Sequence, residues 1–241
     1  MKKPLLLVLI ALTFSLSSCF HIVEELRLNK DGSGTYSLTF DLGELFGNPM
    51  LKEIMEENGE TGLPALGERV DTLIKFTDLS PEQRNQLDRP AFWDKVELRI
   101  FANEEAGEMT STLTLDFDDL SDITYFYKNL DKFQVNGSDM AEGLSGAGNF
   151  LSNGPLFELK GSKFSRIPVK QEPSFSDPEE AEFAKLFFAS GTYTSIYHLP
   201  GKVTKVSRPQ AVVDGRQVTL QYPLLDIMNA EALMDCDIRF K

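Results

Sequence analysis

Hydrophobic and polar residues alternate along several short stretches of this chain, and the stretches come in pairs separated by turn residues. One pair covers residues 21–28 and 36–40, and a second pair covers residues 96–100 and 109–117. A period of two residues is typical of strands that bury one face. Both pairs therefore predict β-hairpins.

Each predicted hairpin runs into a stretch with helical spacing that opens on an acidic residue. Residues 41–55 follow the first hairpin and residues 118–133 follow the second, with apolar side chains three and four positions apart. A weaker third copy covers residues 210–222 and continues into 223–228. This repeated hairpin-helix unit predicts an α+β fold, in which an antiparallel sheet has its helices packed on one face.

Further short helices and one further strand are predicted outside the hairpin-helix units. Residues 68–76 are predicted as a short helix, and another helix is expected to start at Ser80, which suits an N-cap before proline. A helix after Asp177 is expected to end at Gly191. The alternation within residues 193–197 then predicts a further strand.

Residues 136–154 contain five glycines among Asn and Ser, a longer loop than compact domains usually have. This loop is a flap, a linker or a subdomain boundary within one domain of residues 19–241. Within it, residues 143–148 resemble a nucleophile or phosphate loop. Ala147 stands where the hydrolase elbow requires glycine, and no Gly-Lys-Ser/Thr follows, so neither motif is complete.

The amino-terminal residues 1–18 read as an export signal. Lys2 and Lys3 precede a run of apolar residues, and small residues follow it. The run is shorter than the ~20 apolar residues that span a bilayer, which favours a cleaved signal over a permanent anchor.

The sequence Leu16-Ser17-Ser18-Cys19 resembles the lipobox of bacterial lipoproteins. The resemblance implies that the signal peptide is removed before Cys19 and that Cys19 carries acyl chains such as palmitate. Two or more chains give lasting attachment without a membrane span. The alternatives are an ordinary secretory signal with a chance cysteine, and a membrane-embedded helix capped by a buried cysteine.

Lipoprotein sorting rules, applied by the same resemblance, concern the residues after the cysteine. Phe20 replaces the aspartate that retains many lipoproteins in the inner membrane, and no acidic cluster follows Cys19. We therefore expect the outer membrane, with the body facing the periplasm. Because a strand begins at residue 21, there is almost no tether, and we expect the folded body to sit against the membrane.

Composition narrows the function classes. The 241 residues are 41% hydrophobic and carry 37 acidic and 24 basic side chains, a formal charge of −13. Loss of Lys2 and Lys3 with the signal peptide makes the charge −15. The chain is not of the disordered class, and its acidity predicts no basic patch for nucleic acid. Two cysteines are too few for a disulfide scaffold.

One loop and one helix start resemble cation sites. Residues 29–34 resemble the start of a calcium-binding loop, but Phe40 stands where the bidentate glutamate belongs, so a plain hairpin turn is favoured. Acidic residues also cluster around the predicted helix at 120. For that cluster, helix capping is favoured over cation binding; its members are Asp116, Asp118, Asp119 and Asp122.

The remaining reactive side chains favour structural roles. His21 and His198 have no neighbours at ligand spacing for zinc or for a serine-histidine pair. Cys236 lies between two aspartates, which do not activate a thiol, so a packed thiol is expected. Trp93 precedes a strand and is expected to anchor the core, with a partner-facing aromatic as the alternative.

These observations predict a non-enzymatic, lipid-anchored envelope protein that binds a protein or an apolar, lipid-like partner. No cofactor, metal or catalytic residue is expected, and Cys19 is the one predicted site. The alternatives are an envelope hydrolase acting through carboxylates or a serine, and a purely structural envelope protein. The acidic, hairpin-rich body resembles bacterial envelope lipoproteins.

Overall fold

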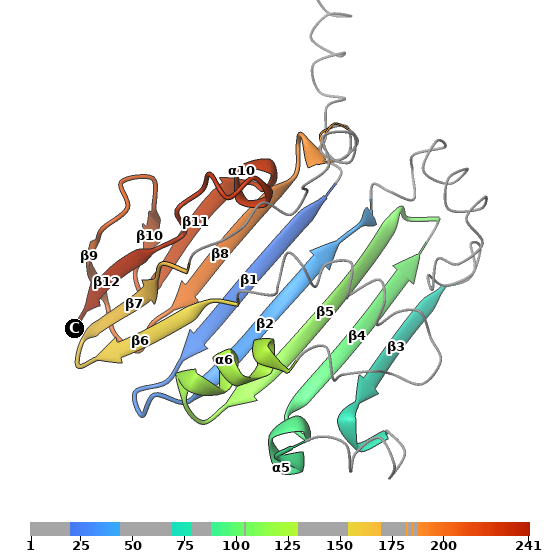
Figure 1. Cartoon of the computed structure of the whole chain (residues 1–241), viewed down its shortest axis with the longest axis horizontal. Helices are drawn as coiled ribbons and strands as arrows, with labels where there is room; N and C mark the ends of the chain where they lie inside the picture. The colour runs from blue at the N-terminus through green and yellow to red at the C-terminus, as the bar shows by residue number, and fades with distance from the viewer. Residues whose placement is uncertain are drawn as a thin grey trace, which may run out of the picture.

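The computed structural model describes residues 20–43, 69–78, 88–103, 105–129, 154–169, 182, 185 and 188–241. These residues form a mostly β, broadly α+β fold with two sheets (Figure 1). The large sheet has eight strands in the order β10 (Val212–Asp214), β11 (Gln217–Pro223), β8 (Thr192–His198), β1 (His21–Leu28), β2 (Gly34–Asp41), β5 (Glu108–Phe117), β4 (Val96–Asn103) and β3 (Val70–Lys75).

The large sheet is mixed, not wholly antiparallel as expected. Its first predicted hairpin pairs β1 with β2, and its second pairs β4 with β5, as the alternation indicated. However, β1 and β8 run parallel, with His21 opposite Thr192. The sequence between these strands is long enough for the crossover that a parallel pair requires, and alternation alone carries no information on strand direction.

A second, four-stranded sheet was not predicted. It has the order β6 (Leu156–Lys160), β7 (Lys163–Ile167), β12 (Cys236–Phe240) and β9 (Val203–Val206). In Figure 1 this small sheet lies in front of β8, β11 and β1. The expectation that helices alone cover the large sheet is therefore wrong. The strands of the small sheet are short and bear many charged residues, which hides their pattern.

The described residues also form three helices: α5 (Pro90–Trp93), α6 (Leu120–Lys128) and α10 (Leu224–Met228). In Figure 1, α6 lies in front of β2 and β5, α5 lies at the lower end of β4, and α10 lies at the upper end of β11 and β8. The helices α6 and α10 directly follow the second and third hairpins. The helix predicted at 41–55 and the one starting at Ser80 fall almost wholly outside the described residues. The hairpin-helix repeat as a whole is therefore not shown.

Residues 70–75 form strand β3, so the helix predicted for 68–76 is wrong. The strand pairs with β4 along its whole length, from Val70 opposite Ala102 to Lys75 opposite Glu97. A short 3-10 helix, η1 (Phe76–Asp78), follows it. The edge of β4 that faces away from β5 offers backbone hydrogen bonds to β3. The local sequence pattern gives no information about such a pairing with a distant strand.

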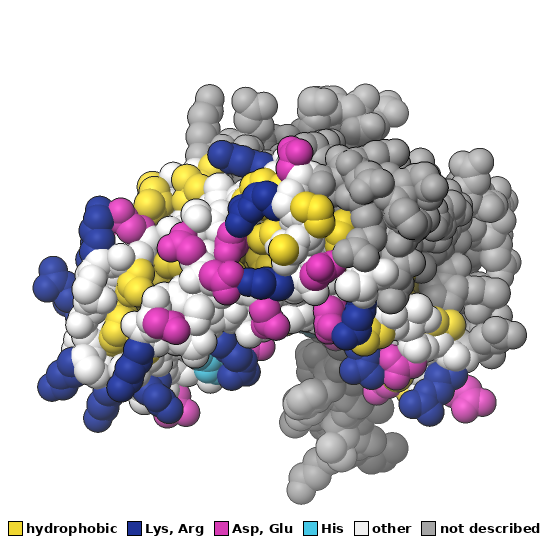
Figure 2. Space-filling model, turned by 90° about the horizontal axis from the view of Figure 1, so that it is seen from below, with side chains coloured by type: hydrophobic (Ala, Val, Ile, Leu, Met, Phe, Trp, Pro, Cys, Tyr) yellow, Lys and Arg dark blue, Asp and Glu magenta, His cyan; other side chains and the backbone are white. Residues whose placement is uncertain are grey.

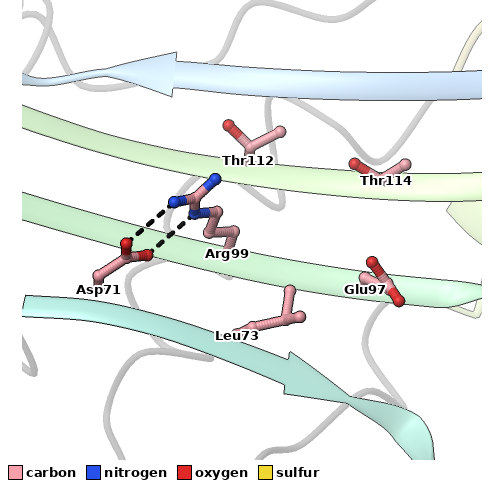
Figure 3. A pocket seen from close by; sticks show the side chains of 6 residues that line it. All are labelled: Asp71, Leu73, Glu97, Arg99, Thr112 and Thr114. Carbon is pink, nitrogen blue, oxygen red and sulfur yellow. Dashed lines mark hydrogen bonds and ion pairs between the residues drawn. The ribbon is translucent and has the colours of Figure 1, made fainter.

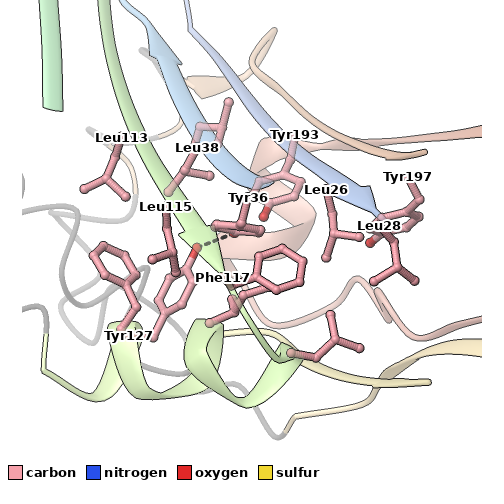
Figure 4. Close-up of a cluster of buried hydrophobic side chains, with 14 of the residues drawn as sticks. Leu26, Leu28, Tyr36, Leu38, Leu113, Leu115, Phe117, Tyr127, Tyr193 and Tyr197 are labelled. Carbon is pink, nitrogen blue, oxygen red and sulfur yellow. Dashed lines mark hydrogen bonds between the residues drawn. The ribbon is translucent and has the colours of Figure 1, made fainter. Parts of the chain in front are cut away.

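The core lies between the large sheet and its cover of small sheet and helices. Inward residues of the central strands are buried, and Figure 4 shows them next to α6, where the Tyr127 hydroxyl is hydrogen-bonded to that of Tyr36. Trp93 is completely buried against Phe76 and Phe126, so its predicted role as a core anchor is confirmed. The described residues contain no helix long and apolar enough to cross a membrane.

Candidate functional site: the open face of the large sheet

A buried ion pair fixes the two sheets against each other. Glu24 lies on β1 at an inward position and has no exposed surface, while the Arg166 side chain enters from β7 and is 5% exposed. Arg166 Nη1 donates to Glu24 Oε1 at 2.5 Å. Charged groups are almost never this buried unless they are paired, so the pair defines how the layers meet.

Tyrosine hydroxyls complete this network. Tyr193 donates to Glu24 Oε2 at 2.7 Å, and Tyr197 and Tyr36 donate to the same carboxylate at 3.2 and 3.3 Å. Arg166 also donates to the Tyr197 hydroxyl at 3.0 Å. The network therefore satisfies the buried charges with hydrogen bonds, as a low-dielectric site requires.

The environment keeps the tyrosines neutral and the arginine charged. Burial, reinforced by the charge of Glu24, raises the pKa of Tyr36 and Tyr193 well above the ordinary value. Burial acts to lower the pKa of Arg166, but the neighbouring Glu24 carboxylate raises it well above its ordinary value. Ser195 Oγ accepts from Arg166 at 3.1 Å and is fully buried. The arrangement links the two sheets and is closed to a substrate.

Sequence reasoning missed this network although one signal was present. Glu24 occupies an inward position in the alternation of strand 21–28, between Ile22 and Leu26. A carboxylate at an apolar position predicts a buried partner. The identity of that partner, Arg166, depends on the second sheet.

The opposite face of the large sheet is polar and not covered by the small sheet. Outward residues of its strands are partly exposed, and hydroxyl groups dominate its centre. They are Thr35, Ser37 and Thr39 on β2, Thr110, Thr112 and Thr114 on β5, Thr192 and Thr194 on β8, and Thr219 on β11. We call this surface the open face.

Hydrogen bonds across strands hold the open face in place. The Oγ1 atoms of Thr39 and Thr112 lie 3.1 Å apart, and Thr35 Oγ1 donates to Asp116 at 2.9 Å. His21 Nδ1 and Thr192 Oγ1 lie 2.7 Å apart. Cross-strand hydroxyl pairs stabilise a sheet and leave further donor and acceptor capacity for a ligand.

A hollow of about 600 Å³ opens on this face over β3, β4 and β5. Figure 3 shows its lining, in which Arg99 reaches Asp71 beside Thr112. Arg99 Nε and Nη2 each donate to one Asp71 carboxylate oxygen at 2.9 Å. This pairing lowers the pKa of Asp71, so the pair stays charged and presents polar groups to the hollow.

A second hollow of about 410 Å³ lies at one end of the large sheet, where β1 and β8 end and β11 begins. His198 belongs to its lining, and His198 Nε2 lies 2.6 Å from Glu25 Oε1. The strands thus bring a carboxylate to His198 that the sequence spacing did not indicate. Five of the six side chains that line the first hollow are polar or charged, and the second hollow has a mainly polar lining, so the open face suits a partner rich in hydrogen-bonding groups.

The apolar hollow beside Ile167 and Leu233 is far smaller, about 30 Å³. That is the space of about one water molecule. It cannot accommodate an acyl chain.

The acidic residues around α6 act as caps and ion-pair partners. Asp119 is the N-cap of α6, its Oδ1 accepts from Ser121 N at 2.8 Å, and Asp122 completes a capping box. Arg89 donates to Asp122 at 2.9 Å, and Lys95 pairs with Asp118. Capping is therefore confirmed. Within the described ranges, no group of three or more His, Cys, Asp or Glu could hold a metal ion.

Two further predictions are confirmed, and others fall outside the structure. Residues 29–34 form a plain hairpin turn, in which Asp31 accepts from the Ser33 backbone at 3.1 Å. Cys236 is a packed, buried thiol, and burial raises its pKa. The signal peptide, Cys19, the 143–148 motif and nearly all of the loop 136–154 lie outside the described residues.

Comparisons with known proteins give little further information. No family model and no curated protein matches this chain. Among solved structures, it is similar to the folded domain of the LppM protein from Mycobacterium tuberculosis, determined by NMR, with 11% identity and a TM-score of 0.42. The match covers 93% of this chain and 90% of the LppM chain. A similarity this weak carries no conclusion about function.

Proposed function

We propose that this protein is a non-enzymatic lipoprotein of the bacterial outer membrane, attached through Cys19, with its body in the periplasm. One observation carries the proposal: Phe20, the residue after Cys19, already packs into the described fold. Thr192 N donates to Phe20 O at 3.1 Å, and the Phe20 ring lies 5.2 Å from that of Phe188. Lipid on Cys19 would therefore hold the body directly at the bilayer surface.

We further propose that the open face binds a protein partner. Its hydroxyl rows and the Asp71–Arg99 pair can hydrogen-bond to backbone and polar side chains. Among the described residues, the hollow beside Ile167 and Leu233 is too small for an acyl chain, so this hollow does not support the lipid-like alternative. Ser195 does not support the hydrolase alternative, because it is fully buried and bonded to Arg166, which is no general base. The loop serine Ser145 lies outside the described residues.

Substitution of the lipidation site tests the anchor. In cells fed labelled palmitate, we expect the wild-type chain to carry label and to fractionate with outer membranes. The Cys19→Ser variant should carry none and should keep an uncleaved signal peptide. A wild-type chain without label, or a Cys19→Ser variant that is still labelled, would contradict the anchor.

Site-specific photo-crosslinking in cells tests the partner. A photoreactive residue at Thr112, on the open face, should give a discrete adduct with one protein. The same residue at Lys128, exposed at the end of α6 on the covered side, serves as the matched control. Thr39→Arg, beside Thr112, should abolish the adduct. Identical patterns from both positions, or no adduct, would favour a purely structural role.

A further inference from the structure

The outer face of the small sheet carries a straight row of four basic side chains. Lys160 lies opposite Lys163, Lys163 opposite Arg239, and Arg239 opposite Lys205. Residues directly opposite each other point to the same face of a sheet. The row therefore crosses all four strands, over about 14 Å at the usual spacing of ~4.8 Å between strands.

Such a row costs stability, because like charges directly opposite each other on neighbouring strands repel. Two of its members have acidic partners: Lys160 pairs with Glu158 at 2.6 Å and Lys163 with Asp237 at 2.9 Å. Arg239 and Lys205 are exposed and form no ion pair with any residue that the structure describes. At the β9 end of the row, the only electrostatic interaction with an acidic residue that the described part of the chain shows is that of Arg239 with Asp237, two positions earlier on β12, and it is not a direct ion pair.

Further cations extend this basic region. Lys202 and Lys241 exchange two backbone hydrogen bonds, of 2.8 and 3.0 Å, beside the row. Figure 2 shows Lys and Arg side chains gathered on the left, at the end of the small sheet, and acidic side chains nearer the middle. The chain as a whole has a formal charge of −13. Folding therefore gathers basic side chains on this surface although the chain as a whole is acidic.

We propose that this cation row binds a linear polymer of linked phosphates, lying across the four strands. Ammonium and guanidinium groups form charge-assisted hydrogen bonds with phosphate oxygens. The next row on the same face favours a linear ligand over a flat bilayer, because it carries Glu158 and Asp237. An anionic bilayer would cover both rows and be repelled by the second, whereas a linear chain follows the cations alone.

Binding of fluorescent linear polyphosphate to the full chain in neutral-detergent micelles tests this proposal. We expect Lys205→Gln with Arg239→Gln to weaken binding at least tenfold. The slope of the logarithm of the binding constant against the logarithm of the salt concentration should become shallower by about 1.4. Each of the two removed charges contributes about 0.7 to this slope on a single-stranded polyanion. The double variant should unfold at the same or a higher temperature, because repulsion within the row is relieved.

Lys95→Gln with Lys128→Gln is the charge-matched control, since both residues lie outside the small sheet and outside the open face. It should bind polyphosphate like the wild type. Equal affinities of wild type and row variant, or an equal loss in the control, would overturn the proposal. Inorganic phosphate at the same phosphate concentration should not compete. Competition by it, or displacement of the polymer by phosphatidylglycerol in the micelles, would assign the row to single ions or lipid headgroups instead.

Discussion

Arg166 and Glu24 meet at 2.5 Å in the closed space between the two sheets, one side chain from each layer. Their burial removes both from water, so much of the attraction is offset by the lost hydration. The pair therefore fixes the position of the small sheet more than it adds stability. That position is what places the basic row and leaves the opposite face of the large sheet open.

Loss of one charge should be severe. Glu24→Gln keeps the shape of the side chain but leaves the Arg166 charge buried without a counter-charge, which costs about 3–5 kcal/mol of unfolding free energy. Denaturant unfolding followed by circular dichroism measures this change. As a control, Glu25→Gln removes the neighbouring, partly exposed carboxylate, which pairs with Arg27 and His198, and should cost about 1 kcal/mol or less. Equal costs for the two variants would contradict a special role for Glu24.

The cap of α6 should have a measurable and pH-dependent effect. Asp119→Ala removes the hydrogen bond to Ser121 N and should lower the unfolding free energy by about 1 kcal/mol at pH 7. Hydrogen bonds from Ser121 lower the pKa of Asp119 in the folded protein. The stabilisation is thus present above the ordinary pKa of 3.8 and is lost as the pH falls through the lowered value. The difference between wild type and Asp119→Ala should accordingly shrink in acid; a difference that does not change with pH would argue against this cap.

Cys236 should be inert in the folded protein. Burial raises the pKa of its thiol, and its side chain is 1% exposed. We expect no reaction with a thiol reagent at pH 8 under native conditions, and full reaction of Cys236 in denaturant. Cys236→Ala should leave anchoring unchanged. Fast modification without denaturant would show that the sheet around β12 opens readily.

Gly34 should not tolerate a side chain. A Cβ atom there would lie 1.9 Å from the backbone oxygen of Arg27 on the paired strand. Gly34→Ala should therefore force β1 and β2 apart at the turn and lower the melting temperature clearly. Ser37→Ala, on the same strand with its side chain on the open face, should change it little. If thermal unfolding shows the two variants to be equal, the close approach at Gly34 is wrong.

Local pattern predicted the elements whose burial alternates cleanly. Strands β1, β2, β4, β5 and β8 were recognised from residues such as Ile22, Leu98 and Tyr197, because each strand buries one face and exposes the other. The same rule failed at β3, where Leu73 is exposed at the sheet edge and the pattern resembled a helix. It also failed for the small sheet, whose strands of four or five residues are too short to show a period.

The candidate site was predicted only in part. The alternation that begins at residue 21 predicted a strand there, and β1 does begin at His21. The open face was not predicted as a site, since its hydroxyl residues are merely the polar half of each strand. Glu24 gave a local signal, but Arg166 follows it by more than a hundred residues.

The sequence by itself determined which residues of each strand face inward, where the turns fall, and which cysteine follows a segment that resembles a lipobox. These properties depend on neighbours a few residues away. Only the tertiary structure decided that β1 and β8 run parallel, that Arg166 meets Glu24, and that Arg239 lies between Lys163 and Lys205. Those contacts join segments far apart in the chain, and their register is set by the packing of the two sheets as a whole.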